Sequence, residues 1–253
     1  MNKACCALPP VSAEYTPKGQ YETIAGLKTY VVKPSDTPNR AIIDVYDVFG
    51  LAPQTIQGAD RLSALTNSVV LVPDFFKGDY CDAAWFGPSA TAESKAALAG
   101  FMERQVRLEA TVEKLAEVRK EVGERWPGVE GHVGVFGLCF GGKIAVMATG
   151  EGNEGTGRKF NVSGTAHPGR LEAKDHEVLN VPHICLASPG EPADVVAKVK
   201  EILSKPGKIG YVETYGTMFH GWMGARANLK DEANLKEYER GYNAVADFFN
   251  KYL

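Results

Sequence analysis

Cys139 lies in a short pattern that suits covalent chemistry. The segment Gly137-Leu138-Cys139-Phe140-Gly141-Gly142 sets a thiol between glycines two residues before and two residues after it. Glycines are needed at those places when a chain turns sharply from a strand into a helix, because the backbone crowds itself there. The first N–H groups of that helix would point at the thiol, and their partial positive charge favours a thiolate and a developing oxyanion. The pattern therefore predicts that Cys139 is a nucleophile rather than a buried structural cysteine.

The same glycines invite a second interpretation, a loop that binds a dinucleotide. Such a loop needs the spacing G-x-G-x-x-G after a strand. That spacing is absent after the expected strand Val133–Phe136, so we favour the nucleophile.

His220 is the histidine whose place in the chain suits a general base. A thiol nucleophile needs a base, and enzymes with a nucleophile on a strand-to-helix turn carry their residues in the order nucleophile, acid, histidine. His220 follows the last expected strand, Ile209–Thr214, and precedes the last expected helix, Asp231–Tyr252. His167, directly after another expected strand, is the alternative base and a candidate pocket residue.

The acid that orients the histidine should follow the expected strand His183–Ala187. The loop after that strand carries two carboxylates, Glu191 and Asp194. Either can hold the imidazole in place and stabilise its cation. Asp194 also suits the cap of the helix expected from Val195. We therefore favour Glu191 and keep Asp194 as the alternative.

Two backbone N–H groups should hold the oxyanion. One belongs to Phe140, which follows the nucleophile, and the other to Val48, in the loop after the expected strand Ala41–Tyr46. The pocket is expected to be mostly apolar and aromatic. Its candidate lining residues are Tyr46, Phe75, Phe76, Lys77, Trp85, Phe86, His167, Phe219 and Trp222.

Short apolar strands alternate with helices from about residue 41 onward. This alternation predicts an α/β fold, with a mostly parallel central sheet and helices on both of its faces. The expected strands are 21–25, 27–32, 41–46, 68–72, 133–136, 160–166, 183–187 and 209–214. The expected helices are 57–66, 92–122 (with Gly100 as the place where it would divide), 142–149, 195–203 and 231–252. We expect residues 1–20 to form an extended arm and residues 21–253 a single domain.

The composition limits the classes of function. The net charge of the 253 residues is -3 and there is no basic stripe, which argues against nucleic acid as a partner. No apolar run reaches the roughly 20 residues of a membrane-spanning helix, and residues 1–10 lack the pattern of a secretory signal. We therefore expect a small-molecule partner, no membrane, and a monomer or homodimer.

The five cysteines match neither a disulfide framework nor a zinc site. This usage favours a reducing, cytoplasmic location, with no metal and no cofactor. Cys5 and Cys6 are interpreted as part of an exposed lead-in, with lipidation or metal binding as the alternatives.

Several motifs, taken in chain order, resemble the dienelactone hydrolases, and the similarity is closest to their fungal branch. The motifs are Asp47-Val48-Phe49-Gly50, Val72-Pro73-Asp74-Phe75-Phe76, the segment around Cys139, and His220-Gly221 with Arg226 shortly after. The resemblance extends from about Tyr21 to Leu253. It implies an α/β-hydrolase fold and a cysteine–histidine–aspartate triad that opens lactones or esters through an acyl-enzyme. It also implies that Asp47 poises the cysteine.

Two positions depart from the family pattern. The resemblance implies that the bacterial members bind the substrate carboxylate with arginines, whereas Lys77 follows Pro73-Asp74 here and no arginine is evident at that point. The triad aspartate falls on Gly190, so either a neighbouring carboxylate has its role or the site works as a dyad. A thiolate tolerates that loss better than a hydroxyl would, because it is nucleophilic without full help from a base.

The main hypothesis is a hydrolase that cleaves a lactone or ester through a Cys139 acyl-enzyme. The missing aspartate and the lack of an evident carboxylate-binding arginine motivate a second hypothesis, a repurposed cyclase or lyase of a biosynthetic pathway. A third is a non-catalytic binding or redox-sensing protein on the same fold, which predicts a poorly reactive thiol.

Overall fold

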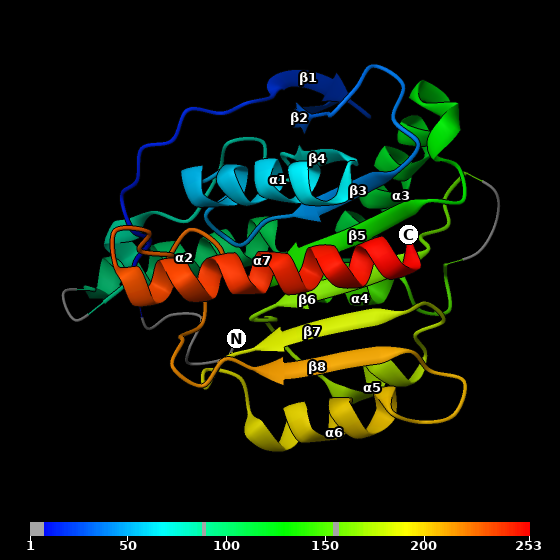
Figure 1. The fold of residues 1–253 in the computed structure, drawn as a ribbon. Coiled ribbons are helices and arrows are strands. Elements are labelled where there is room, and N and C mark those ends of the chain that lie inside the picture. Colours follow the sequence, from blue (N-terminus) through cyan, green and yellow to red (C-terminus); the bar gives the residue numbers. More distant parts are fainter. Residues whose placement is uncertain (1–7, 88–89, 154–156) are drawn as a thin grey trace.

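The computed structural model describes residues 8–87, 90–153 and 157–253, which contain an eight-stranded sheet (Figure 1). Cys5 and Cys6 lie outside the described residues. The strand order across the sheet is β1-β2-β4-β3-β5-β6-β7-β8. The bounds are β1 Gln20–Ile24, β2 Leu27–Val32, β3 Ala41–Val45, β4 Val69–Pro73, β5 Val133–Leu138, β6 Val162–Ala166, β7 His183–Ala187 and β8 Gly210–Thr214. β1 and β2 pair antiparallel with their neighbours, and every pair from β4 to β8 is parallel, which confirms the predicted sheet.

Helices cover both faces of this sheet. α1 (Pro53–Thr66) and α7 (Glu232–Tyr252) pack together on one face, in front in Figure 1. The helices behind the sheet are α2 (Ala92–Gln105), α3 (Leu108–Arg125), α4 (Phe140–Ala148), α5 (Ala173–Glu177) and α6 (Ala193–Leu203). The described residues also contain two short 3-10 turns, Ala83–Trp85 and Pro127–Val129. The inner strands are apolar throughout because both faces are covered: all five residues of β4 are buried.

The long helix predicted over 92–122 is divided, but not at Gly100. Gly100 lies inside α2, and the break falls at Val106 and Arg107, whose backbone leaves the helical region. A glycine inside a helix costs only about 1 kcal/mol relative to alanine, which tertiary packing outweighs. α5 was not predicted; it is a single short turn between β6 and β7.

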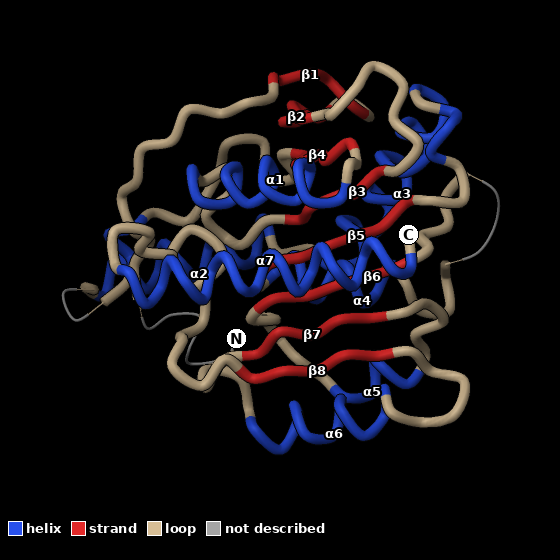
Figure 2. Tube along the Cα trace, in the orientation of Figure 1, coloured by secondary structure: helices blue, strands red, loops and turns tan. Residues whose placement is uncertain are grey.

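The parallel strands bring distant loops to one place. The segments after β3, β5, β6, β7 and β8 all leave the sheet at its carboxyl edge, which is marked by the arrowheads in Figure 1. Figure 2 shows the loops at this edge in tan. Ligands in open α/β sheets bind outside this edge. Over residues 8–87, 90–153 and 157–253, no helix combines the length and apolar character needed to cross a membrane.

A buried carboxyl group on β3 weakens the fold at high pH. Asp44 is fully buried, and neither of its oxygens has a hydrogen-bond partner among the described residues. Burial, and secondly the charge of Asp47, raise the pKa of Asp44 well above its usual range. A carboxyl whose pKa is higher in the folded state keeps its proton longer there, so the free energy of unfolding falls as pH rises from the unfolded pKa to the folded one.

Asp44→Asn should remove this dependence, because the amide has nearly the same shape and no charge. We expect the melting temperature of the variant minus that of the wild type to be larger at pH 9 than at pH 5 by about 3 °C or more. Each unit by which the pKa is raised is worth about 1.4 kcal/mol of this effect. Thermal unfolding at both pH values measures this difference. A difference that is the same at both would mean that Asp44 does not titrate in this way.

Candidate active site

Cys139 lies on a sharp turn between β5 and α4. Its backbone has φ 51° and ψ −107°, a strained combination for a residue with a side chain. The turn is closed by contacts at Gly137 and Gly141: a Cβ on Gly137 would collide with the carbonyl of Gly141, and one on Gly141 with the carbonyl of Val45. The two glycines are therefore required, as the sequence pattern predicted. The strained backbone points the thiol away from the sheet at the start of α4.

His220 and Glu191 form a hydrogen-bonded chain with the thiol. Nε2 of His220 lies 3.0 Å from Sγ of Cys139, and Nδ1 of His220 lies 2.6 Å from Oε1 of Glu191. The other carboxylate oxygen, Oε2, accepts from the Ser188 backbone N–H at 2.5 Å and from the Ser188 hydroxyl at 2.9 Å. All three members of the chain are buried. This arrangement can take a proton from the thiol and stabilise the resulting imidazolium.

Between the two candidate carboxylates, the structure brings Glu191 and not Asp194 to the histidine. Asp194 is exposed in the first turn of α6, which begins at Ala193 and follows Pro192, so Asp194 is not the capping residue that the sequence suggested. Gly190, where the sequence resemblance would place the family's aspartate, donates its N–H to the Ser188 hydroxyl.

Val48 and Phe140 border the same pocket as the thiol. Phe140 is the first residue of α4, so its N–H is one of the free donors at a helix start. Val48 follows β3 in the adjacent loop. The two residues predicted for the oxyanion hole are thus brought together beside Cys139.

Asp47 ties the loop after β3 to the loop that carries His220. Its Oδ1 accepts from the Phe49 N–H at 2.9 Å and its Oδ2 from the Ala225 N–H at 3.0 Å. Burial raises the pKa of Asp47, while those two backbone hydrogen bonds and the charge of Arg226 act in the opposite direction. Asp47 therefore fixes the position of two loops that surround the thiol.

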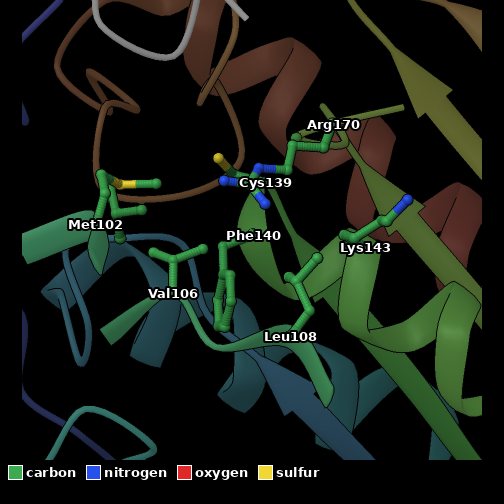
Figure 3. A pocket seen from close by; sticks show the side chains of 9 residues that line it. Met102, Val106, Leu108, Cys139, Phe140, Lys143 and Arg170 are labelled. Carbon is green, nitrogen blue, oxygen red and sulfur yellow. The ribbon is translucent and has the colours of Figure 1, made fainter. Parts of the chain in front are cut away.

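The pocket wall differs from the predicted one. The residues that border the thiol pocket are Val48, Met102, Val106, Leu108, Cys139, Phe140, Lys143, Gly169 and Arg170. Figure 3 shows Met102, Val106 and Leu108 gathered around Phe140, with Arg170 extending toward Cys139. The wall is thus mainly apolar, and Arg170 supplies a positive charge at its edge. That charge, like the start of α4, favours an anion at the thiol.

In the described part of the chain, the pocket does not include the nine side chains predicted to line it: Tyr46, Phe75, Phe76, Lys77, Trp85, Phe86, His167, Phe219 and Trp222. Most of these rings pack on other aromatic rings instead. Tyr46 donates to Asp74 and accepts from the Phe76 N–H, and Trp222 stacks on Tyr215 with ring centroids 4.4 Å apart. Lys77 is exposed. Aromatic residues after strand ends thus complete the core, and the junction of α2 and α3 supplies the wall.

His167, the alternative base, lies beside His220 rather than between it and the thiol. The two rings meet edge to face with centroids 5.2 Å apart. Burial, and then the charges of His220 and Arg226, hold the pKa of His167 well below its usual range. His167 therefore stays neutral next to the histidine that contacts Cys139.

The pocket residues from α2, α3 and the loop after β6 carry no direct signal in the residue pattern. Met102, Val106 and Leu108 look like ordinary helix residues, and only the break between the two helices turns them toward Cys139. Arg170 lies three residues after His167, in the loop that follows the expected strand 160–166. This position near a strand end was the one signal in the sequence that could have placed Arg170 at the pocket. Within the described residues, no group of three or more His, Cys, Asp or Glu is arranged to hold a metal ion.

A parallel sheet covered on both faces, with a residue at positive φ on the turn between a central strand and its helix, defines an α/β-hydrolase fold. Comparison with known proteins agrees: the family model of the dienelactone hydrolase family matches residues 27–253. The chain belongs to the dienelactone hydrolase family.

Its relatives include fungal proteins. An uncharacterized AIM2 family protein of Schizosaccharomyces pombe is 32% identical over 245 residues, covering 96% of this chain and 95% of its own. The hydrolase pyvD of Aspergillus violaceofuscus is 24% identical over 240 residues, covering 93% of this chain and 91% of its own. Among solved structures, a putative dienelactone hydrolase from Klebsiella pneumoniae superposes with a TM-score of 0.71 at 15% identity, covering 92% of this chain and 98% of that one. The resemblance to the fungal branch is thus confirmed.

Proposed function

We propose that this protein hydrolyses esters or lactones through an acyl-enzyme on Cys139. The observation that carries the proposal is the chain of contacts from the thiol to Nε2 of His220 at 3.0 Å, and from Nδ1 to Glu191 at 2.6 Å. A buried thiol on a strained turn, with a base and a carboxylate aligned behind it, is the arrangement of nucleophilic catalysis.

In the first half of the reaction, His220 takes the thiol proton and the sulfur attacks the carbonyl carbon. The carbonyl oxygen becomes an oxyanion between the N–H groups of Val48 and Phe140. When it collapses, the carbon–oxygen bond to the leaving group breaks and His220 returns the proton to that oxygen. In the second half, His220 activates water, which releases the acid and restores the thiol. Glu191 stabilises the imidazolium in both halves.

The pocket favours a substrate with a small, apolar acyl part. Met102, Val106 and Leu108 would contact that part, and the narrow space beside Phe140 limits its size. The leaving group would then face the open side of the site.

The alternative of a repurposed cyclase or lyase rests on two features: Gly190 at the position expected for the acid, and no evident arginine after Pro73-Asp74 to bind a substrate carboxylate. The hydrogen bond from Glu191 to His220 weakens the first of these arguments, because a carboxylate does reach the histidine. Hydrolysis is therefore the function that the geometry supports best.

Trapping the acyl-enzyme tests this proposal. Mixing the protein with a small aryl acetate and quenching with acid should give a protein heavier by one acetyl group, and peptide mapping should place that group on Cys139. Turnover of the ester without an adduct on Cys139, or with one elsewhere, would contradict the proposal.

A further inference from the structure

The N-terminal arm lies against the loop that carries His220. The Val11 N–H donates to the Ala225 carbonyl at 2.9 Å, a contact between segments more than two hundred residues apart in the chain. Further along the arm, the Tyr15 hydroxyl and the Lys18 N–H both donate to Asp60 of α1, at 2.7 and 2.9 Å. The arm is thus anchored at two points and crosses the catalytic edge of the sheet between them.

Gln54, in the first turn of α1, joins the arm to the same loop. Its amide nitrogen donates to the Val11 carbonyl at 2.8 Å and to the Ala227 carbonyl at 3.1 Å. The side chain is buried, and its own backbone carbonyl accepts from the Tyr238 hydroxyl of α7 at 2.6 Å. Gln54, which joins the arm to the loop, is therefore held in place by α1 and α7, and neither helix belongs to the loop.

Arg226 makes a third connection. It is buried, and its Nε donates to the Leu8 carbonyl at 2.5 Å. Its guanidinium lies over the rings of Phe49 and Phe86, 5.1 and 5.5 Å from their centroids. One of its terminal nitrogens lies 3.5 Å from the His220 carbonyl. Arg226 thus links the arm, the loop after β3 and the backbone of the base.

Ala225, in the loop that carries His220, is held by hydrogen bonds on both sides of its backbone. Its N–H is held by the carboxylate of Asp47 and its carbonyl by the N–H of Val11. The base loop is therefore clamped from one side by the segment that carries the oxyanion residue Val48, and from the other side by the arm. The match to the family model begins at residue 27, so the arm's part of this second clamp lies outside the residues that the model matches.

We propose that residues 8–12 of the arm, with Gln54 and Arg226, are positioning elements of the active site: they set the place of His220 relative to Cys139. The inference rests on the proposed function for its kinetic readout. Because the reactivity of Cys139 depends on His220 whether or not an ester is turned over, a second readout is independent of that function. A displacement of about 1 Å in a catalytic group can lower a rate about 100-fold.

The sharpest test is Val11→Pro, which removes the N–H that donates to Ala225. Proline suits this place because the arm is extended and already contains Pro9 and Pro10. Val11→Ala is the matched control, since it loses the side chain and keeps the N–H. Glu14→Pro puts the same ring into the arm where the described structure shows no hydrogen bond from the backbone N–H.

Two measurements decide the outcome. We expect Val11→Pro to lower kcat for a small aryl ester about 10-fold or more with KM changed less than about 2-fold, while both controls stay near wild type. We also expect the alkylation of Cys139 by iodoacetamide, followed against pH at a temperature where all variants are folded, to shift to higher pH in Val11→Pro alone. Gln54→Leu should act in the same direction.

The inference would be overturned if Val11→Pro behaved like the wild type in both alkylation and kinetics. It would also be overturned if Val11→Pro lost activity while its alkylation curve stayed at the wild-type pH. If the wild type hydrolyses no ester, the proposed function fails, and the alkylation curves of Val11→Pro and its controls still decide the role of the arm.

Discussion

Replacing Cys139 by alanine is expected to lower kcat/KM for small aryl esters and lactones by about 10⁴-fold or more. The variant keeps the oxyanion donors and the pocket but has no atom that can form the acyl-enzyme, and removing the nucleophile of a comparable triad costs about 10⁶-fold in kcat. Stopped assays of ester hydrolysis, with the chemical reaction in buffer subtracted, measure the loss.

Cys185→Ala is the matched control. Cys185 is a fully buried thiol on β7, and burial raises its pKa to about 12. It is therefore an inert thiol, and its removal should leave kcat/KM near the wild-type value. A Cys139→Ala variant that hydrolyses esters like the wild type would remove Cys139 from the mechanism.

Local patterns were enough to predict the fold and the sharp strand-to-helix turn that carries Cys139. The strands and most helices were placed within a few residues, because apolar runs between loops leave few other arrangements. The turn at Cys139 was predictable because the glycines on either side of it are required by close backbone contacts. The choice of His220 needed one more step, the chain order nucleophile, acid, histidine, which places the base between the last strand and the last helix.

Features that depend on tertiary packing were not predictable in the same way. The break at Val106 follows from how α2 and α3 pack, and it decides which residues border Cys139. The choice between Glu191 and Asp194 depended on the conformation of the loop after β7. The proposed role of the arm depends on hydrogen bonds of backbone groups, which leave no pattern in the residue types.

The second large effect is expected from Glu191→Gln. The two Ser188 donors face one oxygen of the carboxylate, so a glutamine there would keep its oxygen toward Ser188 and turn its NH₂ group toward Nδ1 of His220. That group can only donate, which moves the histidine proton to Nε2 and leaves no lone pair facing Cys139. The loss of the negative charge also removes the stabilisation of the imidazolium.

The corresponding change in a serine triad costs about 10⁴-fold in kcat, and a thiolate depends less on its base, so we expect a loss of about 10²- to 10³-fold with little change in KM. Steady-state kinetics of Glu191→Gln beside Asp194→Asn measure this, and the exposed Asp194 should tolerate its change without effect. Because the two substitutions remove the same charge from neighbouring positions, a difference between them reports the contact with His220 and not the charge of the loop. Equal kinetics in the two variants would mean that the site works as a dyad of Cys139 and His220.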